Sequence, residues 1–147
     1  MGGHPWFYYV DYEPDIEAAL QKLRRREFLA GRYNPATDFP EFPVDENSPV
    51  IGPQHSSIEE AIEEADADGT RSILDMQEVS HTPDYGVVAP FSSEQLIKLF
   101  GTDRPTREMI EGCEELYDVL ERGKGVYVIV YKDAQPYQIL FAGYSFD

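Results

Sequence analysis

Cysteine and long apolar runs are both scarce in this sequence. Cys113 is the one cysteine among 147 residues, which excludes a disulfide within the chain and is typical of proteins from a reducing compartment. No apolar run approaches the roughly 20 residues that a membrane-spanning helix needs. The N-terminal residues also lack the basic start and apolar stretch of a secretory signal. The sequence therefore predicts a soluble, cytoplasmic protein.

Recognisable catalytic and cofactor-binding motifs are missing as well. His4, His55 and His81 lie far apart, and none has a cysteine or a second histidine at the three- or four-residue spacing of a zinc site. The sequence contains neither the Gly-x-Ser-x-Gly turn of a serine hydrolase nor a phosphate-binding Walker loop. We therefore expect no cofactor, and the balance favours a protein that is not an enzyme.

Positive charge is the third scarcity. The sequence has 12 Lys and Arg residues against 28 Asp and Glu, for a net charge of −16. Binding to nucleic acid or to an anionic membrane depends on Lys and Arg at phosphates, so we expect neither as a partner. A basic or neutral protein is the partner that this charge favours. Solubility and adaptation to salt are alternative reasons for the acidity, and both stay open.

The length and the residue patterns predict one globular α+β domain spanning residues 1–147. We expect a mostly antiparallel sheet of four to five strands, three to four helices packed on it, and a C-terminal β-hairpin. A Pro-rich stretch without periodicity predicts a long loop at about 33–53. The expected strands are 6–12, 71–79, 87–91 and two flanking 132–136, and the expected helices are 15–31, 55–69, 92–101 and 105–123.

The few basic residues gather in one short window. Between Lys22 and Arg32 lie five of the 12, against one acid, Glu27, so the window carries 5 − 1 = +4 and the other residues carry 7 − 27 = −20. On a helical wheel, Glu27 lies in line with the apolar residues Leu20 and Leu23. Two interpretations stay open: a buried carboxylate paired with arginine for structural reasons, or a carboxylate beside a pocket in which Arg32 contacts an anionic ligand.

The stretch that ends this window is "AGRYNP". Its Gly31, Arg32, Asn34 and Pro35 resemble the Gly-Arg-Trp-Asn-Pro stretch of RES-domain toxins, an ADP-ribosyltransferase-like group that cleaves NAD. Tyr33 stands where that family has tryptophan. The similarity covers about six residues and a loosely placed helix downstream. The resemblance implies that Arg32 contacts NAD, and it leaves the essential acid undecided between two glutamates, Glu60 and Glu64.

These residues define an alternative function, a small enzyme that acts on an anionic, nucleotide-type substrate such as NAD. The long loop at 33–53 would then serve as a lid over the substrate. For this alternative the catalytic candidates are Glu27, Arg32 and His55, and the ligand-binding candidates are Arg24, Arg32, Tyr33 and Asn34.

A third interpretation is a calcium loop at 64–75. Acidic residues occupy positions 1, 3, 5 and 12 of this segment, and Gly69 occupies position 6, as in the EF-hand loop. However, Arg71 stands where that loop needs an apolar residue, and the residues that follow predict a strand instead of an exiting helix. An acidic helix end that turns at Gly69 is therefore the favoured alternative. The metal-ligand candidates are Glu64, Asp66, Asp68 and Asp75.

Aromatic residues are concentrated at the two ends of the chain. Because side chains alternate along a strand, the runs at 6–12 and 127–146 place tyrosines on both faces of the sheet. These rings either lie under helices or form a contact surface, since tyrosine suits protein interfaces. Together with the acidity, this favours a protein-binding or regulatory module of the inhibitor or immunity type as the leading hypothesis.

Overall fold

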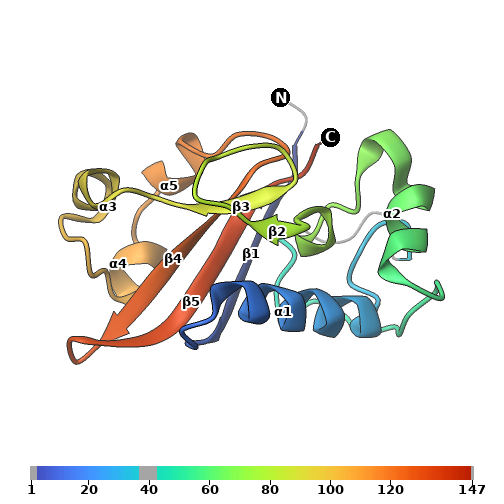
Figure 1. The fold of residues 1–147 in the computed structure, drawn as a ribbon, viewed down its shortest axis with the longest axis horizontal. Helices are drawn as coiled ribbons and strands as arrows, with labels where there is room; N and C mark the ends of the chain where they lie inside the picture. Colours follow the sequence, from blue (N-terminus) through green and yellow to red (C-terminus); the bar gives the residue numbers. More distant parts are fainter. Residues whose placement is uncertain (1–2, 37–42, 147) are drawn as a thin grey trace.

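The computed structural model describes residues 3–36 and 43–146, which fold as a single α+β domain around one five-stranded sheet (Figure 1). No helix in this part of the chain is both long and apolar enough to cross a membrane. Two short 3-10 turns, Asp66–Asp68 and Ile73–Asp75, accompany the regular elements. In chain order these are β1 (Pro5–Asp11), α1 (Ile16–Ala30), α2 (Ile58–Ala65), β2 (Glu78–Val79), β3 (Val87–Pro90), α3 (Ser93–Phe100), α4 (Arg107–Glu111), α5 (Glu115–Asp118), β4 (Gly125–Lys132) and β5 (Gln135–Tyr144).

The sheet is mixed, with strand order β1-β5-β4-β3-β2. The C-terminal hairpin predicted from the sequence is present as β4 and β5, and β1 pairs antiparallel with β5. In contrast, β3 pairs parallel with both β2 and β4. The prediction of a mostly antiparallel sheet is therefore wrong. Parallel neighbours need a long crossover connection, and the segment that holds α3, α4 and α5 supplies it between β3 and β4.

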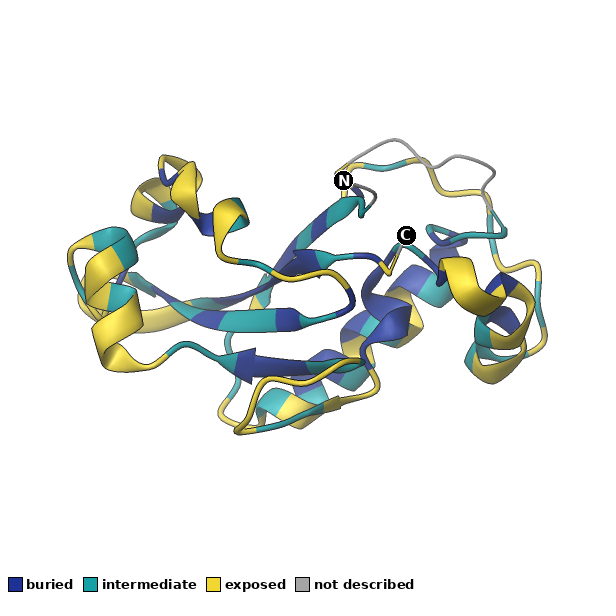
Figure 2. Cartoon of the chain, turned by 90° about the horizontal axis from the view of Figure 1, so that it is seen from above, coloured by how far each residue is buried: buried dark blue, intermediate teal, exposed yellow. Residues whose placement is uncertain are grey.

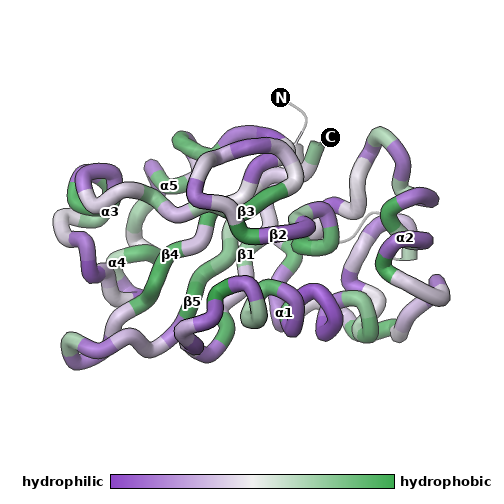
Figure 3. Tube along the Cα trace, in the orientation of Figure 1, coloured by the Kyte–Doolittle hydropathy of each residue, from purple (hydrophilic) through white to green (hydrophobic). Residues whose placement is uncertain are grey.

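Two apolar layers form, one on each face of the sheet, because side chains alternate along the strands. From β1, Trp6 and Tyr8 enter the layer that contains Leu23 of α1. Phe7 and Tyr9 enter the opposite layer, which contains Ile110 of α4. Figure 2 shows this alternation as changes of burial along the strands, and Figure 3 shows apolar residues concentrated along β4 and β5. Aromatic side chains of β1 therefore pack on both faces of the sheet.

The first long helix, α1, forms where the sequence predicts it. The side chain of Asp15 accepts a hydrogen bond from the Ala18 amide at the N-terminus, and Gly31 ends the helix in the left-handed conformation with φ +76°. The amides of Ile51 and Gly52 both donate to the Ala30 carbonyl, at 2.9 and 3.0 Å. The described parts of the predicted Pro-rich loop, 33–36 and 43–53, contain neither helix nor strand, and residues 37–42 lie outside the described residues.

Two predicted elements differ in the structure. The helix expected at 105–123 is divided into α4 and α5, because Gly112 follows the last turn of α4 and its amide donates to both Glu108 and Ile110. The strand expected at 71–79 is reduced to the two residues of β2. The side chain of Ser72 accepts from the Leu74 amide and starts a 3-10 turn there instead. As a result, the part of the chain that the structure describes contains five α-helices in place of the three to four predicted.

Candidate functional site

Glu27 is fully buried near the C-terminal end of α1. Its Oε2 accepts a hydrogen bond from Arg26 Nε and another from Arg32 Nη1, both at 2.9 Å. Its Oε1 is buried and has no hydrogen-bond partner among the described residues. Burial raises the pKa of Glu27 above its ordinary value, and the two arginines offset part of this increase. The helical wheel therefore placed Glu27 correctly, and the arginines hold it as a buried ion pair.

The other predicted ligand residues near Glu27 also have partners within the protein. Arg24 Nη2 donates to the Leu74 carbonyl at 3.2 Å, and Asn34 Nδ2 donates to the Gly69 carbonyl at 3.1 Å. The side chain of Arg32 is only 11% exposed. An anionic ligand at Arg32 would have to compete with the carboxylate of Glu27. The nucleotide-type function stays a prediction, and a change in melting temperature with millimolar NAD tests it.

Tyr33, His55 and Glu64 form a chain of hydrogen bonds that joins the end of α1 to α2. The Tyr33 hydroxyl lies 2.8 Å from His55 Nδ1, and His55 Nε2 contacts the Glu64 carboxylate. The buried Tyr33 ring stacks on Phe28 with its centroid 5.7 Å away. Burial also raises the pKa of Tyr33, so its hydroxyl stays protonated at neutral pH. The structure thus joins Tyr33 and His55, both candidates of the nucleotide-type alternative, and pairs His55 with Glu64.

The segment 64–75 does not gather its acids around one point. The carboxylate of Glu64 is bound to the histidine just described, whereas Asp75 is buried and accepts from the Thr70 amide at 2.7 Å and from Thr70 Oγ1 at 2.8 Å. Asp66 and Asp68 are exposed on a 3-10 turn. Within residues 3–36 and 43–146, no three His, Cys, Asp or Glu side chains are grouped as metal ligands. The geometry therefore gives the calcium interpretation no support.

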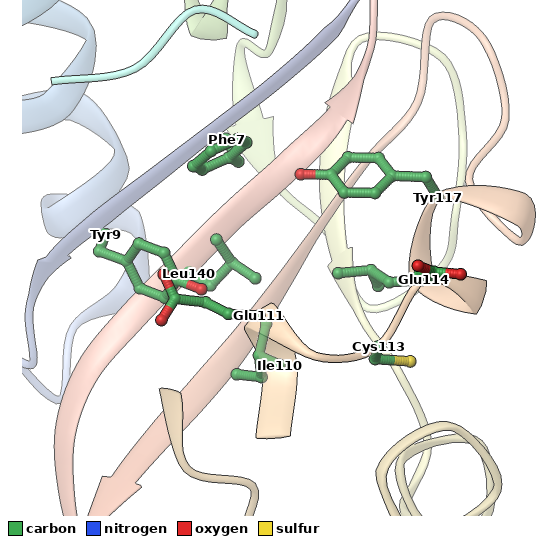
Figure 4. Close-up of a pocket in the computed structure, with 9 residues that line it drawn as sticks. Phe7, Tyr9, Ile110, Glu111, Cys113, Glu114, Tyr117 and Leu140 are labelled. Atoms are coloured by element: carbon green, nitrogen blue, oxygen red, sulfur yellow. The ribbon is translucent and has the colours of Figure 1, made fainter. Parts of the chain in front are cut away.

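A cavity of about 330 Å³ lies on the opposite face of the sheet, between α4, α5 and the strands β1 and β5 (Figure 4). Buried apolar side chains form its floor and three aromatic rings form its walls. Two exposed glutamates, one from α4 and one just before α5, lie at its rim. We call this cavity the aromatic pocket. Its floor is Ile110, Cys113, Leu116 and Leu140, its walls are Phe7, Tyr9 and Tyr117, and its rim is Glu111 and Glu114.

Negative charge in the aromatic pocket comes from carboxylates alone. Burial, and next the charge of Glu111, raises the pKa of Tyr9 to about 12. Burial likewise raises the pKa of Tyr117. Both phenols are therefore neutral at physiological pH. The guanidinium carbon of Arg107 lies 3.9 Å from the centre of the Tyr9 ring, and Arg107 Nε lies 3.6 Å from Glu111 Oε2. One ring and one carboxylate of the pocket thus already hold a cation of the chain itself.

The segment that supplies the two glutamates of the pocket exposes a strongly acidic surface. In residues 107–122, six acidic residues stand against two arginines, Arg107 and Arg122. All six acids are exposed, and so are Met109 and Val119, at 46% and 50%. We call this surface the α4–α5 face and define it by its acids: Glu108, Glu111, Glu114, Glu115, Asp118 and Glu121.

The aromatic pocket was not predicted from the sequence. The strand pattern predicts tyrosines on both faces of the sheet, but nothing in the sequence assigns Tyr117 to a site. The signal that was available is the spacing of Glu108, Glu111, Glu115 and Asp118, which recur every three or four residues. That spacing indicates an acidic stripe along a helix. It could not show that the stripe borders a cavity closed by β1, about one hundred residues away in the chain.

Comparisons with known proteins add no family to this description: no family model matches the chain, and no curated protein or solved structure matches it either.

Proposed function

We propose that this protein is a binding module that receives a basic partner protein on the α4–α5 face. The observation that carries the proposal is the aromatic pocket with two glutamates at its rim, formed in part by a segment that exposes four further acids. Aromatic side chains and methionine are enriched at the centres of protein interfaces, and polar groups form their edges. Phe7, Tyr9 and Tyr117 correspond to such a centre, and the surrounding carboxylates correspond to the edge.

Charge supports a basic partner over a neutral one. The whole chain carries −16, so a positively charged protein is attracted over distances comparable to the Debye length, about 8 Å at physiological salt. Such attraction raises the rate of association and orients the encounter more than it strengthens the final complex. The exposed apolar side chain of Met109 in α4 provides contact area that can hold the complex once it has formed.

A second acidic surface offers a matched control. Residues 58–68, which include α2, contain six exposed acids and no basic residue. Four of them can be neutralised in the variant E59Q/E63Q/D66N/D68N. The test variant is E111Q/E114Q/E115Q/D118N on the α4–α5 face. Each variant has a net charge of −16 + 4 = −12, so both weaken long-range attraction to the same degree.

The experiment compares the partner that each protein captures from an extract of the native host at low salt. We expect the wild type and the α2 control to retain the same basic protein in a stoichiometric amount, and the α4–α5 variant to lose it. If the α4–α5 variant retains that protein as well as the control does, the proposal is wrong. Recovery of no stoichiometric partner by the wild type would also overturn it.

The regulatory part of the proposal is tested on the captured partner. Adding the purified protein is expected to lower the partner's activity, because an inhibitor of this kind covers a functional basic surface. The α4–α5 variant is expected to leave that activity unchanged at the same concentration. An undiminished activity in the presence of saturating wild-type protein would exclude the inhibitor role and leave binding alone.

A further inference from the structure

We propose that the aromatic pocket binds one arginine side chain of the partner, with its guanidinium group between the aromatic walls and the rim carboxylates. This inference rests on the proposed function and names the chemical group that the α4–α5 face recognises. The pocket matches an arginine side chain in its two parts. Its floor is apolar and accommodates the methylene chain, whereas Glu111 and Glu114 lie at the rim, where the charged end needs partners.

The aromatic walls supply the first set of contacts. Figure 4 shows Phe7 of β1 and Tyr117 of α5 on opposite sides of the pocket, with the Tyr117 hydroxyl directed back toward the sheet. Phe7 and Tyr9 are in edge-to-face contact, with ring centroids 6.4 Å apart, which fixes the orientation of that wall. The faces of aromatic rings attract cations because the ring quadrupole is negative there. A planar guanidinium also stacks on such a ring, which an ammonium group cannot do.

The rim supplies the second set of contacts. Glu111 and Glu114 both expose their carboxyl groups to solvent. The two phenols of the pocket stay neutral, as shown above, so they donate and accept hydrogen bonds without adding charge. The site therefore combines an aromatic interior with two carboxylates at its mouth. This combination favours a long side chain with a cationic end over an uncharged or anionic one.

Arg107 provides a precedent within the chain. Its guanidinium carbon lies 3.9 Å from the centre of the Tyr9 ring, and its Nε lies 3.6 Å from Glu111. Arg107 also donates to Gln138 Oε1 at 3.5 Å, and it is not one of the residues that line the aromatic pocket. The same ring and the same carboxylate that line the pocket thus already bind a guanidinium from outside it. A second guanidinium inside the pocket would be received by Phe7, Tyr117 and Glu114, which line it as well.

The test uses Nα-acetyl-arginine amide as the probe and nuclear magnetic resonance of the full chain as the readout. We expect this compound to shift the ring resonances of Tyr9 and Tyr117 in a saturable way, with a dissociation constant on the order of 1 mM for a single side chain. Nα-acetyl-citrulline amide, which has the same shape without the charge, serves as the control. Equal binding of the citrulline compound would overturn the inference, as would the absence of any saturable shift with arginine.

Two pairs of single substitutions locate the site. Y117L removes one aromatic wall and is expected to weaken arginine binding about fivefold, whereas Y85L removes an exposed tyrosine that lies outside the pocket. E114Q removes a rim charge and is expected to weaken binding about threefold, whereas E115Q changes the neighbouring glutamate, which does not line the pocket. E114Q and E115Q alter exposed side chains and leave the core intact. If each test variant binds arginine as its control does, the site is wrongly assigned.

Partner capture separates a failure of this inference from a failure of the proposed function. If E111Q/E114Q/E115Q/D118N loses the partner but Y117L retains it fully, binding through the α4–α5 face is supported and the arginine inference is overturned. If the partner is lost by neither variant, the proposed function is wrong. If arginine binds saturably but no basic protein is captured, the pocket stands and a protein partner as the source of the arginine is excluded.

Discussion

The two arginines that bind Glu27 differ in their exposure to solvent, which separates a buried ion pair from an exposed one. Both donate to the same oxygen at 2.9 Å, but the side chain of Arg32 is 11% exposed and that of Arg26 is 42% exposed. Breaking a buried pair leaves a charge without compensation, whereas an exposed pair contributes little because water screens it.

We therefore predict that R32A lowers the free energy of unfolding by about 2–4 kcal/mol and that R26A lowers it by about 1 kcal/mol or less. Urea denaturation of the two variants, compared with the wild type, measures both values. Equal losses would show that burial does not decide the strength of this ion pair. An unaltered stability of R32A would indicate instead that Arg32 is available for a ligand, as the nucleotide-type alternative requires.

The buried carboxyl group of Asp75 leads us to expect that the stability of the protein depends on pH. Burial raises its pKa from an ordinary 3.8 to about 6, although hydrogen bonds from Thr70 oppose the shift. Its Oδ2 has no hydrogen-bond partner among the described residues, so protonation there removes an uncompensated charge. Because the folded state binds this proton more tightly than the unfolded state does, the stabilising contribution is complete below about pH 4. It is lost as the pH rises through 6.

D75N imitates the protonated side chain at every pH and supplies the control. We expect the stability of the wild type relative to D75N to fall by on the order of 2 kcal/mol between pH 4 and pH 7. Denaturation curves recorded at several pH values measure this difference. Parallel pH profiles for the two proteins would show that Asp75 does not titrate in this range.

At the scale of elements, two helix ends show how tertiary contact changes the role of the same residue. Gly31 ends α1 and Gly101 ends α3, both in the left-handed conformation, with φ +76° and +80°. A Cβ atom at Gly101 would meet nothing within 4 Å. A Cβ atom at Gly31 would lie 2.2 Å from the Gly52 carbonyl oxygen and 2.8 Å from Ile51 Cγ1. Ile51 and Gly52 therefore pack directly on the end of α1.

We predict that G101A lowers the free energy of unfolding by about 1 kcal/mol, because alanine is strained in the left-handed conformation. We predict that G31A lowers it by at least about 2 kcal/mol, because the neighbouring backbone must also move. Thermal or urea denaturation of both variants gives the comparison, and the difference between them reports the close approach of residues 51–52 to Gly31. A cost for G31A no greater than that for G101A would mean that this segment moves away freely.

Several elements were predictable because their signals are local. Asp15 and Gly31 fix α1, and Ser92 with Gly101 fixes α3, through hydrogen bonds between residues no more than four apart. The prediction of a strand at 71–79 was wrong because part of this segment forms a 3-10 turn whose hydrophobic residues pack against α1. That conformation depends on contacts between residues far apart in the sequence. The prediction of one helix at 105–123 was wrong because the helical spacing of apolar residues continues past Gly112, whereas the helical backbone of α4 ends there.

At the scale of the whole molecule, the direction of β3 decided the topology. Its residues 87–90 were correctly predicted to be extended, but an extended segment carries no information on which neighbour it pairs with. The long connection through α3, α4 and α5 returns the chain to the end of the sheet at which β3 begins. As a result, β4 runs parallel to β3. The sheet therefore became mixed, and the helices of that connection came to cover the face of β1 that carries Phe7 and Tyr9.

The amino-acid sequence alone determined the α+β class, the caps of α1 and α3, the C-terminal hairpin and the burial of Glu27 beside arginines. Each of these follows from short-range periodicity or from charge within one helix. Only the tertiary structure decided that Tyr33 meets His55, and that Glu111 and Glu114 lie at a pocket with aromatic residues of β1. These contacts join residues from separate elements, and the packing of those elements is set by the core as a whole, so no local pattern encodes it.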